Sequence, residues 1–316
     1  MNRFKELPFL LAIILLLSMI LSPFASADEP EKLNVVSLGD SITYGYGLSE
    51  PSKAYPHLIG NGSNHVTNIS YPGWTSTDLL TDLKANQAAA AKLQEADVIT
   101  LNIGANDLMQ AIGIGEIIAS QQPFVPTEEH LAKIDLASNQ LAVNLQEMIT
   151  IIRANSAAPI LLYSIYNPFG PSQDPFAASL HMLGEQVTTN VNTLVIGPLS
   201  SVTGAIYLDT NSTFNDNQLT YIIPGDIHPT LAGHKALAKL ATNAWIAVQP
   251  PKEEITIEEA MKEDPEEVEP PAENKPSNIA TSMFSFLTVG FCLIGAGAGV
   301  FIIQRIRKLK SEKTHF

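Results

Sequence analysis

The feature that most constrains the fold is a regular alternation of short β-rich runs with longer helical stretches between Leu33 and Val248. The β-rich runs are too brief for helices, and their content of valine, isoleucine and leucine is typical of buried strands. Strands that alternate with helices predict an α/β domain with a parallel sheet covered by helices on both faces. In chain order, the predicted strands are residues 33–38, 66–70, 97–103, 159–165 and 204–209, and the predicted helices are residues 77–93, 127–155, 175–194 and 230–248.

The N-terminus carries a pattern that indicates export. Arg3 and Lys5 precede an apolar run over residues 7–21, and the small residues of the sequence ASA end at Ala27. A basic start, a short apolar middle and a small-x-small end predict a secretory signal peptide over residues 1–27. An uncleaved anchor is the alternative.

A second hydrophobic segment lies near the C-terminus. Residues 279–303 carry no charge and have about the length that a bilayer core requires, which predicts a transmembrane helix. Arginines and lysines follow at once in residues 304–316, so the positive-inside rule predicts a basic cytoplasmic tail. The single cysteine, Cys292, falls inside this segment. The exported domain therefore has to be held together by its core, without disulfides.

The stretch before the predicted transmembrane helix is acidic and rich in proline. Residues 251–275 hold ten acidic residues and three lysines, a net charge of −7 out of −14 for the whole chain. A like-charged segment of this kind cannot bury enough apolar surface to fold, which predicts an extended stalk over residues 251–278. Residues 28–250 remain, and they suffice for one domain. No basic stripe exists outside the tail, which argues against nucleic acid as a partner.

Distinctive loops follow the predicted strands. The sequence GDS, ending at Ser41, follows the first strand, YPGWTS with Gly73 follows the second, and GANDL with Asn106 follows the third. His228 lies in PGDIHPT, beyond the fifth strand. Taken singly, each has an ordinary explanation: a helix cap for the serine, turns for the glycine and asparagine, and a surface position for the histidine. Because loops at the carboxyl ends of parallel strands share one edge of the sheet, we expect them on one rim.

Together, these residue types are what acyl transfer requires. A serine hydroxyl is a poor nucleophile until a neighbouring imidazole accepts its proton, which makes Ser41 the candidate nucleophile and His228 the candidate base. The oxyanion that then forms needs preorganised donors. The backbone N–H groups of Ser41 and Gly73 and the side chain of Asn106 are the candidate donors.

The four blocks resemble those of the SGNH hydrolases, also called GDSL esterases and lipases. GDSIT is similar to the family's nucleophile block, NISYPGWTS to its glycine block, GANDL to its G-x-N-D block and HPT to its histidine block. GDSITYGYGL followed by YPHLI is most similar to the bacterial secreted lysophospholipase and esterase branch. The resemblance implies a flavodoxin-like three-layer α/β/α fold around a mostly parallel five-stranded sheet, and ester hydrolysis without metal or cofactor. It assigns the nucleophile to Ser41, the oxyanion donors to Gly73 and Asn106, and the base to His228.

The sequence departs from the family pattern at the acidic residue. The family's acid usually lies three residues before the histidine, where this chain has Gly225, whereas Asp226 lies two residues before it. We predict that Asp226 orients His228 and stabilises its charged form. The alternatives are Asp209, at the end of the fifth strand, and a Ser-His dyad assisted by a backbone carbonyl. The other two carboxylates of the motifs are expected to fix loop geometry, namely Asp40 and Asp107.

These features predict a membrane-tethered, outward-facing serine esterase. Its expected substrates are acyl lipids, including lysophospholipids, or the O-acetyl groups of a cell-surface polymer. A second hypothesis is a surface binding module that kept the fold and lost turnover, which Gly225 favours and the four retained blocks oppose. Aromatic residues near the rim are candidates for lining an apolar acyl pocket, namely Tyr44, Tyr46, Trp74 and Phe169.

Overall fold

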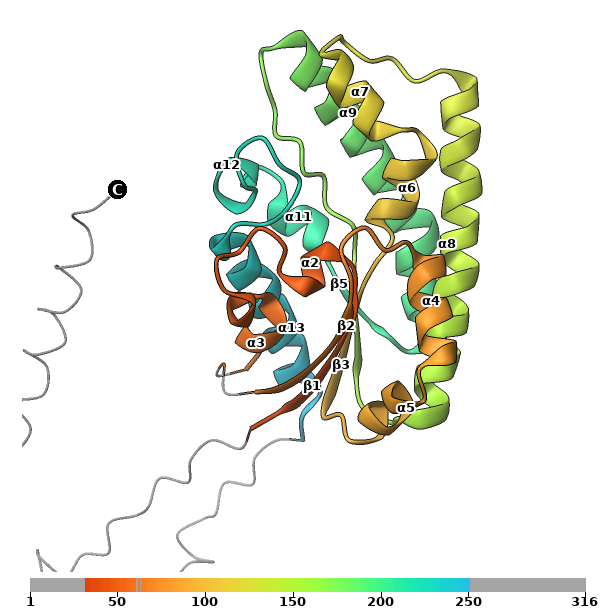
Figure 1. Cartoon of the computed structure of the whole chain (residues 1–316), viewed down its shortest axis with the longest axis vertical. Coiled ribbons are helices and arrows are strands. Elements are labelled where there is room, and N and C mark those ends of the chain that lie inside the picture. The colour runs from red at the N-terminus through yellow and green to blue at the C-terminus, as the bar shows by residue number, and fades with distance from the viewer. Residues whose placement is uncertain (1–31, 61, 63, 251–316) are drawn as a thin grey trace, which may run out of the picture. The chain divides into compact units, whose positions relative to one another are not determined.

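Five short parallel strands form the centre of the domain (Figure 1). The computed structural model describes residues 32–60, 62 and 64–250. Every neighbouring pair of strands is parallel, in the order β2-β1-β3-β4-β5, so the predicted parallel five-stranded sheet is confirmed. The strands are β1 (Asn34–Gly39), β2 (His65–Ser70), β3 (Val98–Asn102), β4 (Ile160–Tyr163) and β5 (Ile206–Leu208).

Helical segments connect the strands, because a parallel pair cannot be joined by a tight hairpin. Those before β4 are α2 (Ser41–Tyr44), the 3₁₀ helix η1 (Pro51–Lys53), α3 (Tyr55–Leu58), α4 (Ser76–Ala85), α5 (Gln87–Gln94), α6 (Ala105–Ala111), α7 (Ile114–Ser120) and α8 (Glu128–Asn155). Those after β4 are α9 (Pro175–Val191), the π-helical turn η2 (Asn192–Ile196), α10 (Gly197–Thr203), α11 (Thr210–Phe214), α12 (Gln218–Tyr221) and α13 (Leu231–Val248).

Alternate strand residues enter two hydrophobic cores, one on each face of the sheet. Val36 and Leu38 of β1 pack into the core beneath α4, α5 and α8, whereas Val35 packs into the core beneath α3 and α13. Figure 1 shows the sheet between these two groups of helices. Successive strand side chains point to opposite faces, so a strand covered on both sides is apolar at nearly every position. The structure thus has helices on both faces of the sheet, as predicted.

Two predicted helices differ from the structure. The stretch 77–93 forms two helices, because Asn86 ends α4 and its side chain caps α5 by accepting a hydrogen bond from the Ala89 N–H group at 3.3 Å. The stretch 175–194 continues from α9 through a π-helical turn into α10. Several shorter helices were not predicted from the sequence, among them α6 and α7 beside the site. The helix predicted over residues 127–155 is confirmed, since Thr127 caps α8 through the His130 N–H group.

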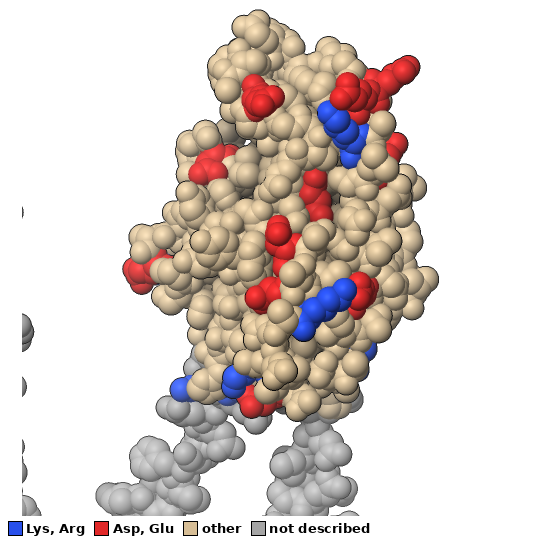
Figure 2. Space-filling model, turned by 45° about the vertical axis from the view of Figure 1, so that its right-hand side comes forward, with Lys and Arg blue, Asp and Glu red and all other residues tan. Residues whose placement is uncertain are grey.

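The predicted signal peptide, stalk, transmembrane helix and tail lie outside the described residues. Within residues 32–250, as far as they are described, no helix has both the length and the apolar character needed to cross a membrane. Acidic and basic side chains are interspersed on the face seen in Figure 2. The exposed ion pairs include Lys84 with Glu147 at 2.7 Å and Lys133 with Glu129 at 2.8 Å.

His234 of α13 is a buried ionisable group in the core beneath α3 and α13. Its side chain is fully buried, and its Nδ1 accepts a hydrogen bond from the Tyr55 N–H group at 3.2 Å, which ties α13 to the start of α3. Burial lowers the pKa of His234 from 6.5 to about 4, with a smaller contribution from the charge of His228. Between these two pH values the unfolded chain binds more protons than the folded one, so acid destabilises the fold.

Replacement of His234 by asparagine should flatten the acid side of the stability profile. In His234→Asn the amide oxygen can still accept from the Tyr55 N–H group, but the titratable group is lost. Between pH 6.5 and pH 4, the free energy of unfolding should therefore fall by roughly 3 kcal/mol less in the variant than in the wild type. Urea unfolding of residues 28–250 across this pH range measures the difference. Parallel pH profiles of the free energy of unfolding in the wild type and the variant would contradict the prediction.

Candidate active site

Ser41 lies at the carboxyl end of β1, where the chain turns sharply into α2. A Cβ atom on Gly39 would lie 2.0 Å from Thr43 Oγ1 and 2.5 Å from the Asn102 carbonyl oxygen, so only glycine fits at that position. Asp40 is the N-cap of α2, because its Oδ1 accepts from the backbone N–H group two residues later at 3.0 Å. Ser41 is therefore not the helix cap, which was one of its two explanations, and its hydroxyl is free for another partner.

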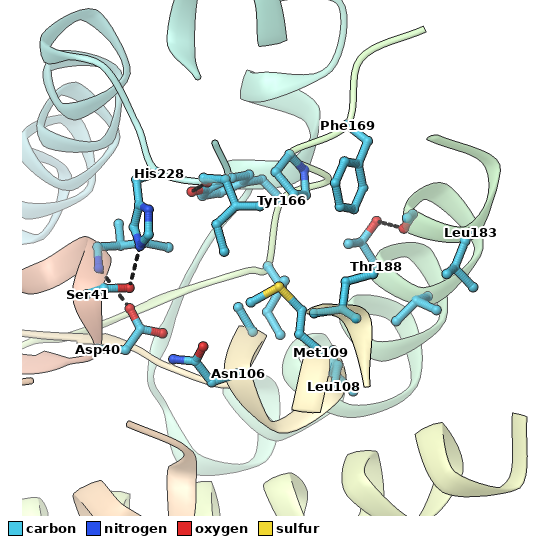
Figure 3. A pocket seen from close by; sticks show the side chains of 18 of the residues that line it. Asp40, Ser41, Asn106, Leu108, Met109, Tyr166, Phe169, Leu183, Thr188 and His228 are labelled. Atoms are coloured by element: carbon cyan, nitrogen blue, oxygen red, sulfur yellow. Dashed lines mark hydrogen bonds between the residues drawn. The ribbon is translucent and has the colours of Figure 1, made fainter. Parts of the chain in front are cut away.

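That partner is His228, although the two residues are 187 positions apart in the chain. His228 Nε2 lies 2.9 Å from Ser41 Oγ, a contact drawn in Figure 3. On the other side of the imidazole, Nδ1 lies 2.6 Å from Asp226 Oδ1. A hydroxyl, an imidazole and a carboxylate thus form one hydrogen-bonded chain at the carboxyl edge of the sheet.

A tight turn brings Asp226 to His228 from only two residues away. The carbonyl of Ile223 accepts from the Asp226 N–H group at 2.9 Å, and the Ile223 N–H group donates to the His228 carbonyl at 3.0 Å. Pro224 and Gly225, with φ +76° at the glycine, occupy the central positions of a type II turn. The position where the family has its acid is thus used by a turn glycine, and Asp226 reaches the imidazole instead.

Asp209, the alternative acid, is engaged elsewhere. Its carboxylate caps α11 by accepting from the Ser212 N–H group at 3.0 Å. Within the described residues it makes no hydrogen bond to His228, whose Nδ1 is already paired with Asp226. The geometry therefore brings Asp226, and not Asp209, next to the imidazole.

The pKa values of Asp226 and Asp40 are shifted in opposite directions. Partial burial raises the pKa of Asp226, but hydrogen bonds from the His228 side chain and the Ile227 N–H group, with the charge of His228, outweigh it and leave the pKa below its usual value. Burial raises the pKa of Asp40 to about 7, although the Ile42 N–H group lowers it. Asp226 is thus ionised over the neutral range, whereas Asp40 is a buried group that fixes the turn.

The second and third motifs are joined beside this chain of side chains. A Pro-Gly type II turn follows β2, with the Trp74 N–H group donating to the Tyr71 carbonyl at 3.2 Å and Gly73 at φ +84°. Asn106, in the first turn of α6, donates from Nδ2 to the Trp74 carbonyl at 2.8 Å, and Gln110 donates to the Gly73 carbonyl at 3.1 Å. The glycine loop is thus clamped onto α6 by two side-chain amides.

These contacts leave three polar N–H groups without a partner. Among the described residues, no hydrogen bond is formed by the backbone N–H group of Ser41 or of Gly73, and Asn106 uses one of its two amide hydrogens. Asn106 and Ser41 line the same pocket. The Ser41 N–H group and the second amide hydrogen of Asn106 are therefore available to an anion in this pocket, whereas Gly73 is not among the residues that line it.

Asp107 holds the loops together, as predicted for a geometry-fixing residue. Its two carboxylate oxygens accept from the Ser76 N–H group at 2.8 Å and from Ser76 Oγ at 2.5 Å. Asn144 of α8 donates to Ser76 Oγ at 2.8 Å and to Thr77 Oγ1 at 2.9 Å. This network ties α6, α4 and α8 to one another directly behind the glycine loop.

A chain of hydroxyl groups fixes α2 on the opposite face of the sheet. Thr100 of β3 donates to Ser37 of β1 at 2.8 Å, and the Tyr55 hydroxyl lies 3.3 Å from the Thr100 hydroxyl and 3.0 Å from that of Thr43. All four side chains are buried. Because each hydroxyl has a partner, the network anchors the helix that carries Ser41 without leaving an unpaired hydroxyl in the core.

An apolar pocket opens from Ser41 toward α6, α7 and α9. It encloses about 850 Å³, part of it open to solvent, and its polar side chains gather mainly at the end occupied by Asp40, Ser41, Asn106 and His228 (Figure 3). The rest of the lining is largely aliphatic and aromatic: Ile42, Leu108, Met109, Ile112, Ile114, Ile134, Ile165, Tyr166, Pro168, Phe169, Leu183, Val187 and Ile227.

Little of this lining was predicted from the sequence. Of the four aromatic residues proposed for it, Phe169 lines the pocket, whereas Trp74 packs against the core and Tyr44 is 44% exposed. Tyr46 packs against the ring of His228. The apolar wall comes mainly from α6, α7, α9 and the segment that follows β4, whose apolar residues could equally have packed in the core. The one sequence signal for this wall is the helical spacing of the apolar residues after GANDL.

The arrangement can activate a hydroxyl and stabilise an anion in a site with an apolar wall. His228 can take the Ser41 proton while Asp226 accepts from the other ring nitrogen, which is the hydrogen-bonding pattern of serine hydrolases. In the part of the chain that the structure describes, no group of three His, Cys, Asp or Glu side chains is arranged to hold a metal ion.

Comparisons with known proteins identify the family of this chain. The profile of the "GDSL-like Lipase/Acylhydrolase family" matches residues 37–236. The uncharacterized protein YpmR of Bacillus subtilis is 26% identical over 236 residues, covering 71% of this chain and 85% of that protein. The spore germination lipase LipC of Bacillus licheniformis is 24% identical over 219 residues, covering 66% and 93%. An extracellular lipase from Streptomyces rimosus aligns with a TM-score of 0.49 and 20% identity over 66% of this chain and 98% of its own.

The family match spans more than half of the 316 residues and includes all four blocks at the rim of the sheet. The chain therefore belongs to the GDSL-like lipase and acylhydrolase family and is a carboxylic ester hydrolase.

Proposed function

We propose that this hydrolase is a membrane-tethered, outward-facing serine esterase that cleaves esters of apolar acyl chains. The observation that carries the proposal is the apolar pocket that begins at the hydrogen-bonded pair of Ser41 and His228. A bound ester would place its carbonyl carbon beside Ser41 Oγ and its acyl chain along the apolar wall. Burial of that chain stabilises the complex by about 0.8 kcal/mol per methylene group.

In the proposed mechanism, Ser41 Oγ attacks the ester carbonyl and its proton passes to His228 Nε2. The resulting imidazolium gives that proton to the departing alkoxide, which leaves as an alcohol, and an acyl group remains on Ser41. Water then attacks the acyl group while His228 accepts its proton, and the imidazolium returns that proton to Ser41 Oγ as the bond to the acyl group breaks, which releases the acid and restores the serine and the neutral imidazole. Asp226 accepts from Nδ1 throughout and favours the imidazolium electrostatically.

The tetrahedral intermediates of both steps carry a negative oxygen. We assign the backbone N–H groups of Ser41 and Gly73 and the free amide hydrogen of Asn106 as its donors. The support is that these groups lack partners among the described residues, while Asn106 is held in place by Trp74. Donors held before the reaction begins need no reorganisation when charge develops.

A long acyl chain fits this pocket better than an acetyl group does. An acetyl group would leave most of the apolar lining uncovered, whereas a longer chain replaces water along it. The similarity to a relative named as a spore germination lipase also supports an acyl-lipid substrate. O-acetylated polymers are the alternative substrates, and a chain-length series separates the two.

A binding module without turnover finds less support. It was favoured by the glycine at the usual position of the acid, but Asp226 lies 2.6 Å from the imidazole and makes the missing interaction. Ser41 and His228 also lie within hydrogen-bond distance of each other.

The location is proposed from the sequence. A signal peptide over residues 1–27 would export the chain, and an apolar segment over residues 279–303 with its basic tail would hold it in the membrane. The acidic stalk over residues 251–278 would separate the catalytic domain from the bilayer.

A series of p-nitrophenyl esters from acetate to dodecanoate tests the substrate class. We expect kcat/KM to rise by up to about fourfold per methylene until the pocket is filled, and Ser41→Ala to abolish turnover throughout. Leu183 lies at the end of the pocket away from Ser41 (Figure 3), so Leu183→Phe should penalise the longest esters and spare acetate. Met182→Phe, at the exposed neighbouring residue, should leave the series unchanged. A maximum at acetate would refute the acyl-chain proposal.

The acidic residue is tested by a pair of matched substitutions. Asp226→Asn should lower kcat by at least about a hundredfold, since the same change in a serine protease triad costs about ten thousandfold. Asp209→Asn should change kcat less than about twofold, because asparagine caps a helix as well as aspartate does. Steady-state kinetics with thermal unfolding as a control measures both. Two small losses would indicate a Ser-His dyad, and the reverse ranking would move the acid to Asp209.

The location is tested by protease treatment of intact cells that express the full chain. An extended, proline-bearing stalk is accessible to proteases, so cleavage within residues 251–278 should release an active esterase into the medium. A variant that lacks residues 279–316 should be secreted without protease. Activity that is found in the cytosol would contradict the proposed location.

A further inference from the structure

Tyr46 lies against the ring of His228, although neither the four motifs nor the proposed mechanism gives it a role. The two ring centroids are 4.6 Å apart and the ring planes meet at 46°. Tyr46 is nevertheless 48% exposed, so its contact with the imidazole is not part of a hydrophobic core. An aromatic ring that is half in water and packed on the candidate base requires a separate explanation.

The backbone around Tyr46 is shaped to hold it there. Gly45 and Gly47, on either side, have φ values of +85° and +83°, which side-chain-bearing residues rarely adopt. The Tyr46 N–H group donates to the Ser41 carbonyl at 2.9 Å. A Cβ atom on Gly47 would lie 2.7 Å from Ile223 Cδ1, so this segment packs against the turn that carries Asp226 and His228. Tyr46 is thus fixed to both halves of the site.

The contact with Tyr46 adds to the hydrogen bonds that hold the two ring nitrogens of His228. Ser41 and Asp226 occupy the two ring nitrogens, and Tyr166 holds the neighbouring backbone by donating to the Ile227 carbonyl at 2.9 Å. The other titratable groups around the imidazole are Asp40, at the same end of the pocket, and His234, on α13. Burial raises the pKa of Asp40 and lowers that of His234.

We propose that Tyr46 is a positioning residue whose ring stabilises the protonated form of His228 during the reaction. The inference rests on the proposed function, in which His228 becomes an imidazolium in each transition state. A cation within about 6 Å of an aromatic centroid is attracted by the negative face of the ring, and the contact also fixes the plane of the imidazole. For a half-exposed pair, the expected gain in rate is about two- to fivefold.

Substitutions that separate the charge interaction from packing test the proposal. Tyr46→Leu removes the aromatic face and should lower kcat and kcat/KM together by about two- to fivefold. It should also move the acid limb of the pH profile of kcat/KM down by about half a pH unit, because the protonated ring loses its partner. Tyr46→Phe should restore most of the rate. Pentafluorophenylalanine at this position keeps the shape but reverses the ring polarity, and it should behave like leucine or worse.

The neighbouring Tyr44 provides the matched control. It is exposed to a similar extent, at 44%, and does not line the pocket, so Tyr44→Leu should leave the rate and the pH profile unchanged. An effect of Tyr46→Leu on KM alone would overturn the proposal and assign Tyr46 to substrate binding. Equal rates for phenylalanine and pentafluorophenylalanine would also overturn it, since packing alone would then suffice. If Ser41→Ala stays active, the proposed function fails instead, so the two failures are distinguishable.

Discussion

The structure depends on the constraint that parallel strands impose on the chain. Each strand must be followed by a crossover that returns to the same starting edge, so every strand ends at the opposite, shared edge. Loops that are distant in sequence therefore meet there, including the turn with Ser41, the Pro-Gly turn after β2, and the start of α6. Because both faces of the sheet are buried under helices, this edge is the part of the sheet where polar side chains can gather beside solvent.

Two Pro-Gly turns perform the same task on the two sides of the site. One follows β2 and exposes the Gly73 N–H group, and the other precedes His228 and directs the Asp226 carboxylate to the imidazole. Proline fixes one central residue of the turn, and glycine accepts the positive φ of the next. Both turns are thereby defined before substrate binds, which is what preorganised catalysis requires.

The site is supported by two polar networks and bounded by one apolar surface. On one face of the sheet, hydroxyl groups link α2 to β1 and β3, and on the other, Asp107 and Ser76 link α6 to α4. These networks hold the polar groups at one end of the pocket, while α6, α7, α9 and the segment after β4 supply most of the apolar wall. This asymmetry supports the proposed preference for an ester with a polar reacting centre and an apolar chain.

The sequence by itself determined the parallel sheet, the order of the motifs and the positions of Ser41, Gly73, Asn106 and His228. These are local properties, since strand and helix periodicity, turn residues and helix caps depend on neighbours in the chain. The sequence favoured Asp226 but left Asp209 and a Ser-His dyad open, because the spacing departs from the usual family pattern. Only the turn at Gly225 decided that Asp226 contacts the imidazole. The pocket wall and the contact between Tyr46 and His228 were likewise decided by tertiary structure, because both join segments far apart in sequence. An apolar helix face reads the same in a sequence whether it packs on a core or lines a pocket, and only the packing of the other elements distinguishes the two.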